Sequence, residues 1–490
     1  MRHPDERAWG GWIGIALVCA CLGVSVSAQD RPAQIDAYLA RVHDLHQFDG
    51  AVLVADAQGV LFKKAYGLAD REWDVPSTPA TKFRIGSITK QFTAALALQL
   101  VEEGRITLDT KLSEVLPYYR KDTGEMVTVR HLLNHTSGIP SLTQLPSFQE
   151  IRTRNPHSVE ETVKRFCSGD LQFAPGTQFR YNNSGYYILG AVIEKVTGKP
   201  YEQVLRERIT DPLKMTGTGY DRARDVLLNR ASGYQRFPGG VRNCSYIDMA
   251  VPFAAGALYS TVEDLYLWDR ALDSGQVLSE SSKKAMFMPG LGDYGLGWYI
   301  RKAPVGPGNT ERLVFSHSGG IEGFTAHLRR LPEERIFVVL LDNCTFGRLE
   351  VIADGILDVL FGRVPPPPRR SVAEVFYEAH RKSGAGAAVA LLRELQVRKA
   401  SEYDFSEAAI NLLGYQLLGE REPDAAVAVF QMNAELHPDS SNVYDSLGEG
   451  LAALGKKDDA VRAYAKSLTL DPSNRNAVEW LDRLSKQPAP

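Results

Sequence analysis

The sequence predicts an α+β domain followed by an all-α domain. Runs typical of β-strands occur near the start of the chain and again beyond its middle, with helical patterns between them, which is the order expected of α+β architecture. The two groups of strands would have to meet to complete one sheet. A proline-rich segment then precedes a tail whose pattern recurs every 34 residues. The length of 490 residues agrees with two folded units.

Residues 1–28 have the features of a secretory signal peptide. Arg2 and Arg7 precede an apolar run at 12–26, which is short for a bilayer span. The run ends in Val26-Ser27-Ala28, a cleavage signal of small residues. We therefore expect an exported protein, periplasmic or secreted, with no transmembrane span in the mature chain. An uncleaved anchor helix and a lipid anchor through Cys21 are the weaker alternatives.

Residues 29–362 carry the elements of the first domain. The expected strands are 51–55, 60–66, 297–302, 313–315, 324–331 and 336–342, and the last is continuously apolar, as in a buried strand. The expected helices are 34–46, 88–103, 127–134, 184–196, 201–208 and 261–273. The domain should end near Gly362, because the segment 363–371 contains four consecutive prolines and reads as a stiff linker.

Residues 372–490 are expected to form a domain of helical repeats. Several positions recur 34 residues later: Leu413-Gly414 recurs as Leu447-Gly448, Leu417 as Leu451, Ala426 as Ala460, Phe430 as Tyr464, and Pro438 as Pro472. Period and residue types resemble the tetratricopeptide helix-turn-helix repeat, whose arrays bind peptides and proteins. The segment 371–396 would supply a degenerate third pair, and 470–486 the capping helix. A protein or peptide partner at these repeats is therefore one expectation.

Charge and cysteine content exclude some classes of partner and site. The formal net charge of -3 gives no electrostatic reason to expect nucleic acid as a partner. The mature chain would keep Cys167, Cys244 and Cys344, an odd number at wide spacings that suggests neither a disulfide framework nor a zinc site. One disulfide plus a free thiol stays open. No metal-binding spacing occurs, and we expect neither metal nor cofactor.

The first candidate for chemistry is the tetrad Ser87-Ile88-Thr89-Lys90. Serine is a poor nucleophile unless a neighbour takes its proton. At the start of a helix, a spacing of three residues places Ser87 and Lys90 on one face, near free N–H groups. Lys90 can act as a base only if burial or a positive neighbour lowers its pKa from about 10.4.

The same spacing also occurs by chance elsewhere in the chain. Ser281-Ser282-Lys283-Lys284 matches it, but lies in a polar stretch that a solvated helix face explains. Ser87 differs because it opens an apolar helix. Two further motifs are therefore needed to support Ser87 as a nucleophile.

These two motifs are Tyr181-Asn182-Asn183 and His317-Ser318-Gly319-Gly320. A tyrosine beside a cationic lysine can titrate low enough to serve as a general base, and an amide two residues on can hold a substrate carbonyl. The glycines of the second motif permit close backbone approach to a ligand, and a free N–H there could complete an oxyanion hole.

Taken in this order, the three motifs resemble those of the class C β-lactamase-like, or penicillin-binding-protein-like, serine hydrolases. That family includes D-alanyl-D-alanine carboxypeptidases, D-aminopeptidases and family VIII esterases. The resemblance covers roughly residues 30–360 and implies an antiparallel five-stranded sheet flanked by helices, a mostly helical lobe, and an active site between them.

By the same resemblance, Ser87 would be acylated while Lys90 and Tyr181 manage its proton. Asn183, His317, Gly319 and Gly320 would contact the substrate, with the N–H groups of Ser87 and Gly320 forming the oxyanion hole. One departure matters: many β-lactamases and carboxypeptidases carry lysine where His317 stands. Since a neutral imidazole binds a carboxylate less well than an ammonium does, this favours an esterase or a D-amino-acid peptidase or amidase over an efficient β-lactamase.

Each candidate also has an ordinary structural explanation. Ser87 or Asn183 could cap a helix, Tyr181 could be a core tyrosine and His317 a turn histidine. His135 is better explained as a loop-stabilising residue than as a second base, because no G-x-S-x-G elbow accompanies it.

Two functions follow from these motifs. The first is a serine hydrolase acting through an acyl-enzyme on a small amide or ester, of the β-lactam, D-amino-acid peptide or ester class. The alternative is a catalytically retired hydrolase that serves as a binding or scaffold protein through its repeats.

Overall fold

The computed structural model describes residues 30–153, 157–237, 240–306, 308, 310–345 and 347–486. The predicted signal peptide lies outside these residues. Within them, no helix has the length and apolar content of a membrane span. Cys167, Cys244 and Cys344 are free thiols, so none of the three pairs with another.

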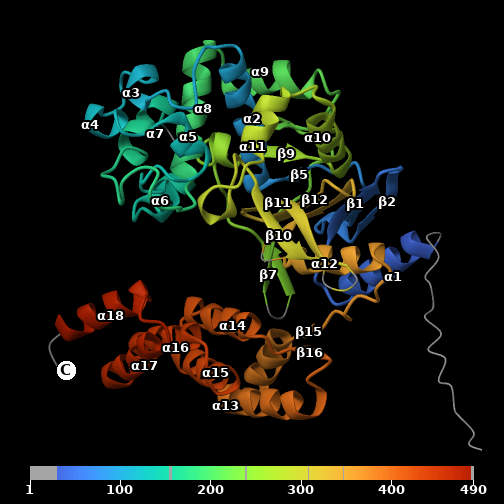
Figure 1. Ribbon diagram of the computed structural model, residues 1–490. Helices are drawn as coiled ribbons and strands as arrows, with labels where there is room; N and C mark the ends of the chain where they lie inside the picture. The colour runs from blue at the N-terminus through green and yellow to red at the C-terminus, as the bar shows by residue number, and fades with distance from the viewer. Residues whose placement is uncertain are drawn as a thin grey trace, which may run out of the picture.

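A six-stranded antiparallel sheet forms the centre of the first domain (Figure 1). Its order is β10 (Tyr299–Pro304), β11 (Glu311–Ile321), β12 (Phe324–Leu331), β13 (Ile336–Asp342), β1 (Gly50–Asp56) and β2 (Gly59–Tyr66). The two ends of the domain meet where β1 pairs with β13, in the register Val52 to Leu340. Every residue of β13 is buried, which agrees with its continuous apolar run.

The five strands implied by the family resemblance were one too few. Each of the six β-like runs of the sequence is a strand, and β10 forms the edge of the sheet. It pairs with β11 only from Glu311 to Ser316, because it begins at Tyr299. The end of β11 from His317 onward is therefore flanked by β12 alone among the strands of this sheet.

Helices cover both faces of the sheet, as Figure 1 shows. The helices α1 (Arg31–Asp44) and α12 (Leu349–Leu360) pack on one face, against Val52 and Val54 of β1. The helices α2 (Thr89–Glu102) and α10 (Val262–Ser274) pack on the other, where Leu53 points. Since successive strand residues face opposite sides, one short apolar strand serves both hydrophobic cores.

A mostly helical lobe lies beside α2. It contains α3 (Leu112–Val115), α4 (Lys121–Gly124), α5 (Val129–Leu133), α6 (Phe148–Arg152), α7 (Val159–Phe166), α8 (Asn183–Thr197) and α9 (Tyr201–Leu205), and α11 (Glu280–Met286) packs against α2. The helix predicted at 201–208 leaves α geometry after Leu205 and continues as a π turn, Arg206–Thr210. The remaining strands, each of two to four residues, form small sheets, of which β7 (Tyr234–Phe237), β8 (Gly240–Asn243) and β14 (Cys344–Thr345) are one.

The C-terminal part is helical, as expected. It comprises α13 (Val372–Lys399, kinked at Gly384), α14 (Glu407–Gly419), α15 (Pro423–Leu436), α16 (Ser441–Ala453), α17 (Lys457–Leu470) and α18 (Arg475–Lys486). The rings of Phe430 and Tyr464 lie against Gly414 and Gly448, where an added β-carbon would come within 2.3 and 2.7 Å of them. The identity of these helix pairs as tetratricopeptide repeats stays a prediction.

Two glycines let β11 lie directly against the short helix η2 (Gly86–Ile88), which carries Ser87. A β-carbon at Gly319 would lie 1.9 Å from the carbonyl oxygen of Ile85. At Gly86, where φ is +49°, a β-carbon would lie 2.8 Å from the backbone nitrogen of Gly320. Only hydrogen fits at both positions, so the strand and the serine are held together by backbone contact.

This contact predicts opposite results for two neighbouring alanine substitutions. Gly319→Ala should lower the free energy of unfolding by about 1–3 kcal/mol, because the methyl group meets backbone that cannot move aside. Gly320→Ala should change it by less than about 0.5 kcal/mol, since nothing lies within 4 Å of that position. Chemical denaturation of both variants measures the difference. Equal losses would show that β11 and η2 are not in the contact described.

Candidate active site

Ser87 lies in the turn that leads into α2, and Lys90 follows it in the first turn of that helix. The residue that precedes α2 is Ile88, so Ser87 is not the cap of this helix. Lys90 is fully buried, an arrangement that is rare for a lysine without a partner charge. Among the residues that the structure describes, no carboxylate lies within ion-pair distance of its amine.

The amine of Lys90 has three polar neighbours. Its Nζ lies 2.9 Å from Ser87 Oγ, 2.9 Å from Asn183 Oδ1 and 2.8 Å from the carbonyl oxygen of Ala255. Burial lowers the pKa of Lys90 well below its usual value. A neutral amine has two N–H groups and one lone pair.

The chemistry of these neighbours orients the amine. Asn183 Oδ1 and the Ala255 carbonyl can only accept hydrogen bonds, so they take the two N–H groups of a neutral Lys90. The third neighbour, Ser87, can donate from its hydroxyl. When the amine is neutral, its lone pair is thus left for the Ser87 hydroxyl, which is the geometry that a general base requires.

Tyr181 completes the group around Ser87. Its hydroxyl is hydrogen-bonded to Ser87, and its ring centre lies 4.9 Å from Lys90 Nζ. Burial raises the pKa of Tyr181. The hypothesis that Tyr181 titrates low enough to be a base therefore receives no support. Burial favours the neutral form of both groups, and the neutral form is the base for Lys90 but the acid for Tyr181.

Asn183 is the first residue of α8, and both ends of its amide are used. Oδ1 faces Lys90, and Nδ2 donates to Thr143 Oγ1 at 3.2 Å. The cap of α8 is the preceding residue, Asn182, whose side chain accepts a hydrogen bond from the Gly185 N–H at 3.0 Å. Capping and positioning are thus divided between two consecutive asparagines.

His135 joins two loops of the site. Its Nδ1 accepts a hydrogen bond from the Asn182 N–H at 3.1 Å, and its carbonyl oxygen accepts one from the Arg180 N–H at 2.9 Å. Its ring centre lies 4.3 Å from that of Tyr181. These contacts agree with the loop-stabilising role expected for His135.

His317 is buried and neutral. Its Nδ1 lies 2.7 Å from the Ser318 carbonyl oxygen, which can only accept, so Nδ1 carries the ring hydrogen. Its Nε2 then accepts from the Tyr294 hydroxyl at 3.0 Å. Burial lowers the pKa of His317 to about 3, with a smaller effect of Lys90 whenever that amine is charged. A direct contact between His317 and substrate stays a prediction.

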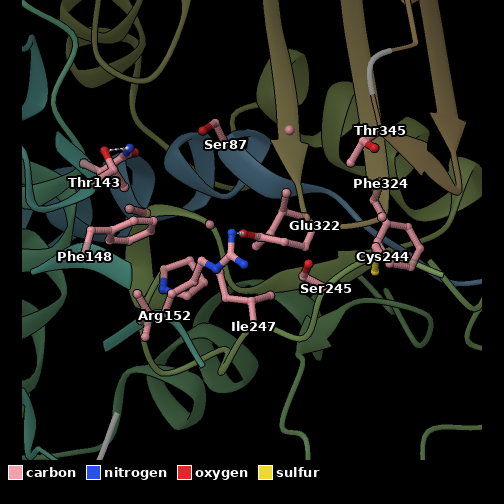
Figure 2. Close-up of a pocket in the computed structure, with 18 of the residues that line it drawn as sticks. Ser87, Thr143, Phe148, Arg152, Cys244, Ser245, Ile247, Glu322, Phe324 and Thr345 are labelled. Atoms are coloured by element: carbon pink, nitrogen blue, oxygen red, sulfur yellow. Dashed lines mark hydrogen bonds and ion pairs between the residues drawn. The ribbon is translucent and has the colours of Figure 1, made fainter. Parts of the chain in front are cut away.

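Two cavities reach Ser87. The first, of about 460 Å³, is also lined by Asn183 and Gly320. Apolar side chains form much of its wall, and Arg152 faces Glu322 across it at 3.5 Å between Nη1 and Oε1 (Figure 2). Ser87 and Gly320, the two residues whose N–H groups are predicted to form the oxyanion hole, both border this cavity.

The second cavity, of about 680 Å³, opens on the side of Tyr181. Its remaining lining residues are Tyr299, Arg301, Ser316, His317, Ser318, His327, Arg329 and Glu350. It is therefore the more polar of the two.

The structure thus brings together the predicted site residues, with Gly319 behind them as a packing position. Sequence reasoning missed the carbonyl of Ala255, the hydroxyl of Tyr294 and the carboxylate of Glu350. A backbone carbonyl leaves no signal in the sequence. Tyr294 lies in a segment, 294–298, that shares the family resemblance but suggests no role for its hydroxyl, and Glu350 lies in no motif.

Several known proteins are similar to this chain in sequence. The chain is 29% identical over 320 residues to the Bacillus subtilis protein PbpX, covering 65% of this chain and 75% of that protein. It is 28% identical to Protein flp of Staphylococcus aureus over 329 residues, covering 64% of this chain and 63% of that relative, less than two thirds of its length.

A solved structure is also similar. The D-stereospecific amidohydrolase from Streptomyces sp. is 28% identical, with a TM-score of 0.55 over 66% of this chain and 98% of that protein. The sequence model of the beta-lactamase family matches residues 35–361, well over half of the chain. With its α+β fold and this match, the chain belongs to the beta-lactamase family.

Proposed function

We propose that the protein is a serine hydrolase that forms an acyl-enzyme on Ser87 from a small amide or ester. The observation that carries this proposal is the buried amine of Lys90, whose two acceptor neighbours leave its lone pair for the Ser87 hydroxyl. A retired site would have no reason to keep a lysine buried without a counter-charge, because that burial costs folding free energy.

Acylation would begin with transfer of the Ser87 proton to Lys90 while Oγ attacks the substrate carbonyl carbon. The negative charge that develops on the carbonyl oxygen would be held by the N–H groups of Ser87 and Gly320. The N-terminal end of α2 adds a favourable dipole at the same place. Asn183 keeps Lys90 in position through its Oδ1.

Collapse of the tetrahedral intermediate requires a proton on the leaving group. Tyr181 is suited to deliver it, because its hydroxyl is hydrogen-bonded to Ser87, borders the second cavity and stays protonated when buried. Lys90, now charged, would restore the proton of Tyr181. Water would then hydrolyse the acyl-enzyme with Lys90 again acting as base.

The substrate class we propose is an ester or a D-amino-acid amide or peptide rather than a β-lactam. Neutral His317 gives no positive charge for a substrate carboxylate. The similarity to a D-stereospecific amidohydrolase supports the amide alternative. For the rest of the chain we propose export to the periplasm or the medium, and protein or peptide binding at the tetratricopeptide-like helices.

Labelling by a fluorophosphonate probe tests Ser87 against the second match to its motif. The protein should be labelled, and Ser87→Ala should lose labelling altogether, because Ser87 Oγ is the hydroxyl that lies 2.9 Å from Lys90 Nζ. Ser281→Ala, at an exposed serine with the same spacing to a lysine, should be labelled at the rate of the unmodified protein. Intact-mass measurement would report both.

The proposal would be wrong if the folded protein took up no probe and hydrolysed neither esters, nor D-amino-acid amides, nor nitrocefin. Labelling that persisted in Ser87→Ala would place the nucleophile elsewhere.

The pH dependence of labelling should reveal the base. Lys90 acts only when neutral, so the second-order labelling rate should be constant above its pKa and fall about tenfold per pH unit below it. Because burial lowers this pKa, the fall should occur well below the usual range of lysine. A rate that kept rising toward pH of about 10.4 would indicate an unperturbed lysine.

A further inference from the structure

We propose that the second cavity is a leaving-group subsite that selects a leaving group bearing an ammonium and rejects one bearing a carboxylate. Glu350, in the first turn of α12, is the residue that decides this selectivity. The proposal rests on the proposed function, since it concerns which half of the substrate lies on each side of Ser87.

The position of Tyr181 assigns the two halves of the substrate. The leaving atom must receive a proton, and Tyr181 borders the second cavity but not the first. The bond from Ser87 Oγ to the carbonyl carbon forms first, and the bond from that carbon to the leaving atom then breaks. The leaving atom takes the proton of Tyr181, and Lys90 replaces that proton with the one it took from Ser87. The leaving group therefore departs into the second cavity, while the acyl group stays in the first, beside Gly320.

Glu350 brings a negative charge into the second cavity. Its Oε1 accepts a hydrogen bond from the Ser318 hydroxyl, and its side chain remains 56% exposed. Within the described part of the chain, its one ion-pair neighbour is His327, 3.9 Å away. Burial lowers the pKa of His327 well below its usual value, so this neighbour is neutral.

The positive groups of this cavity are already paired. Arg329 bonds to Asp354, whose carboxylate lies on the same helix as Glu350. Arg301 lies 3.6 Å from Asp293 and stacks on the ring of Tyr299 at 5.0 Å. Each arginine of this cavity thus has a carboxylate partner, whereas no arginine or lysine of the described residues lies within ion-pair distance of Glu350.

The hydroxyl of Ser318 also has hydrogen-bond partners within the protein. Ser318 donates to Glu350, and its oxygen lies 3.0 Å from His327 Nδ1. A substrate carboxylate that approached Ser318 would have to displace Glu350 and would be repelled by it. An ammonium at the same place would be attracted to Glu350 with no loss of the Ser318 bond.

Three acetate esters separate these cases: phenyl acetate, 3-acetoxybenzoate and 3-acetoxy-N,N,N-trimethylanilinium, which share an acyl group and differ in leaving-group charge. The quantity to compare is the ratio of kcat/KM for the cationic ester to that for the anionic ester. Glu350→Gln should lower this ratio about fivefold to tenfold. The substitution removes an exposed-pair attraction for the cationic ester and a repulsion of similar size for the anionic ester, and both changes lower the ratio. The kcat/KM for phenyl acetate, a neutral ester that lacks that pair, is the reference that removes any effect of the substitution common to all three esters.

Glu374→Gln is the matched control. Like Glu350, Glu374 is an exposed acid in the first turn of a helix, here α13, but it does not line the cavity. Glu374→Gln therefore removes the same kind of charge without changing the cavity. It should leave the ratio unchanged. In the unmodified protein, added salt should lower kcat/KM for the cationic ester and raise it for the anionic one, a test that needs no variant.

Two results would overturn the subsite assignment: a ratio unchanged in Glu350→Gln, or faster turnover of the anionic ester together with its loss in Arg301→Gln. Either could occur with normal fluorophosphonate labelling of Ser87, and the proposed function would then survive. Absence of labelling and of all ester hydrolysis would instead remove the proposed function on which the subsite depends.

Discussion

The site depends on one buried amine. Lys90 lies between two oxygen atoms that can only accept, with no counter-charge among the described residues. The burial that makes this costly also lowers the pKa of the amine and so makes its lone pair available to Ser87. The surroundings serve that arrangement. The backbone of β11 lies against the Ser87 turn because Gly86 and Gly319 have no side chains, and α8 begins where Asn183 can reach the amine.

Much of the fold could be predicted from the pattern of apolar residues. The runs at 51–55 and 336–342 are apolar on both faces, so they had to be central strands, and they pair. The resemblance was a poorer guide to strand number than the pattern itself, which contained the run that became β10. The three motifs predicted which side chains meet around Ser87. They could not predict the contact with Ala255, since it is made by a backbone carbonyl, nor the neutral state of Tyr181, which depends on burial.

The two cavities divide the chemistry by charge. The proposed acyl side combines apolar walls with the paired Arg152 and Glu322. The proposed leaving-group side carries Glu350, which has no arginine or lysine within ion-pair distance in the described part of the chain. Neutral His317 lines the same cavity as this carboxylate, and both arginines that line it, Arg301 and Arg329, are paired with aspartates. A serine hydrolase with these two cavities would prefer substrates whose leaving group is neutral or cationic.

NMR of protein labelled with ¹³C at the lysine ε-carbon shows whether the amine of Lys90 is charged. The Lys90 signal is identified by its absence in Lys90→Arg. At neutral pH its ε-carbon should show the chemical shift of a free amine, while exposed lysines show that of an ammonium. An ammonium shift for Lys90 in the unliganded protein at that pH would contradict the account, because a charged lysine has no lone pair for Ser87.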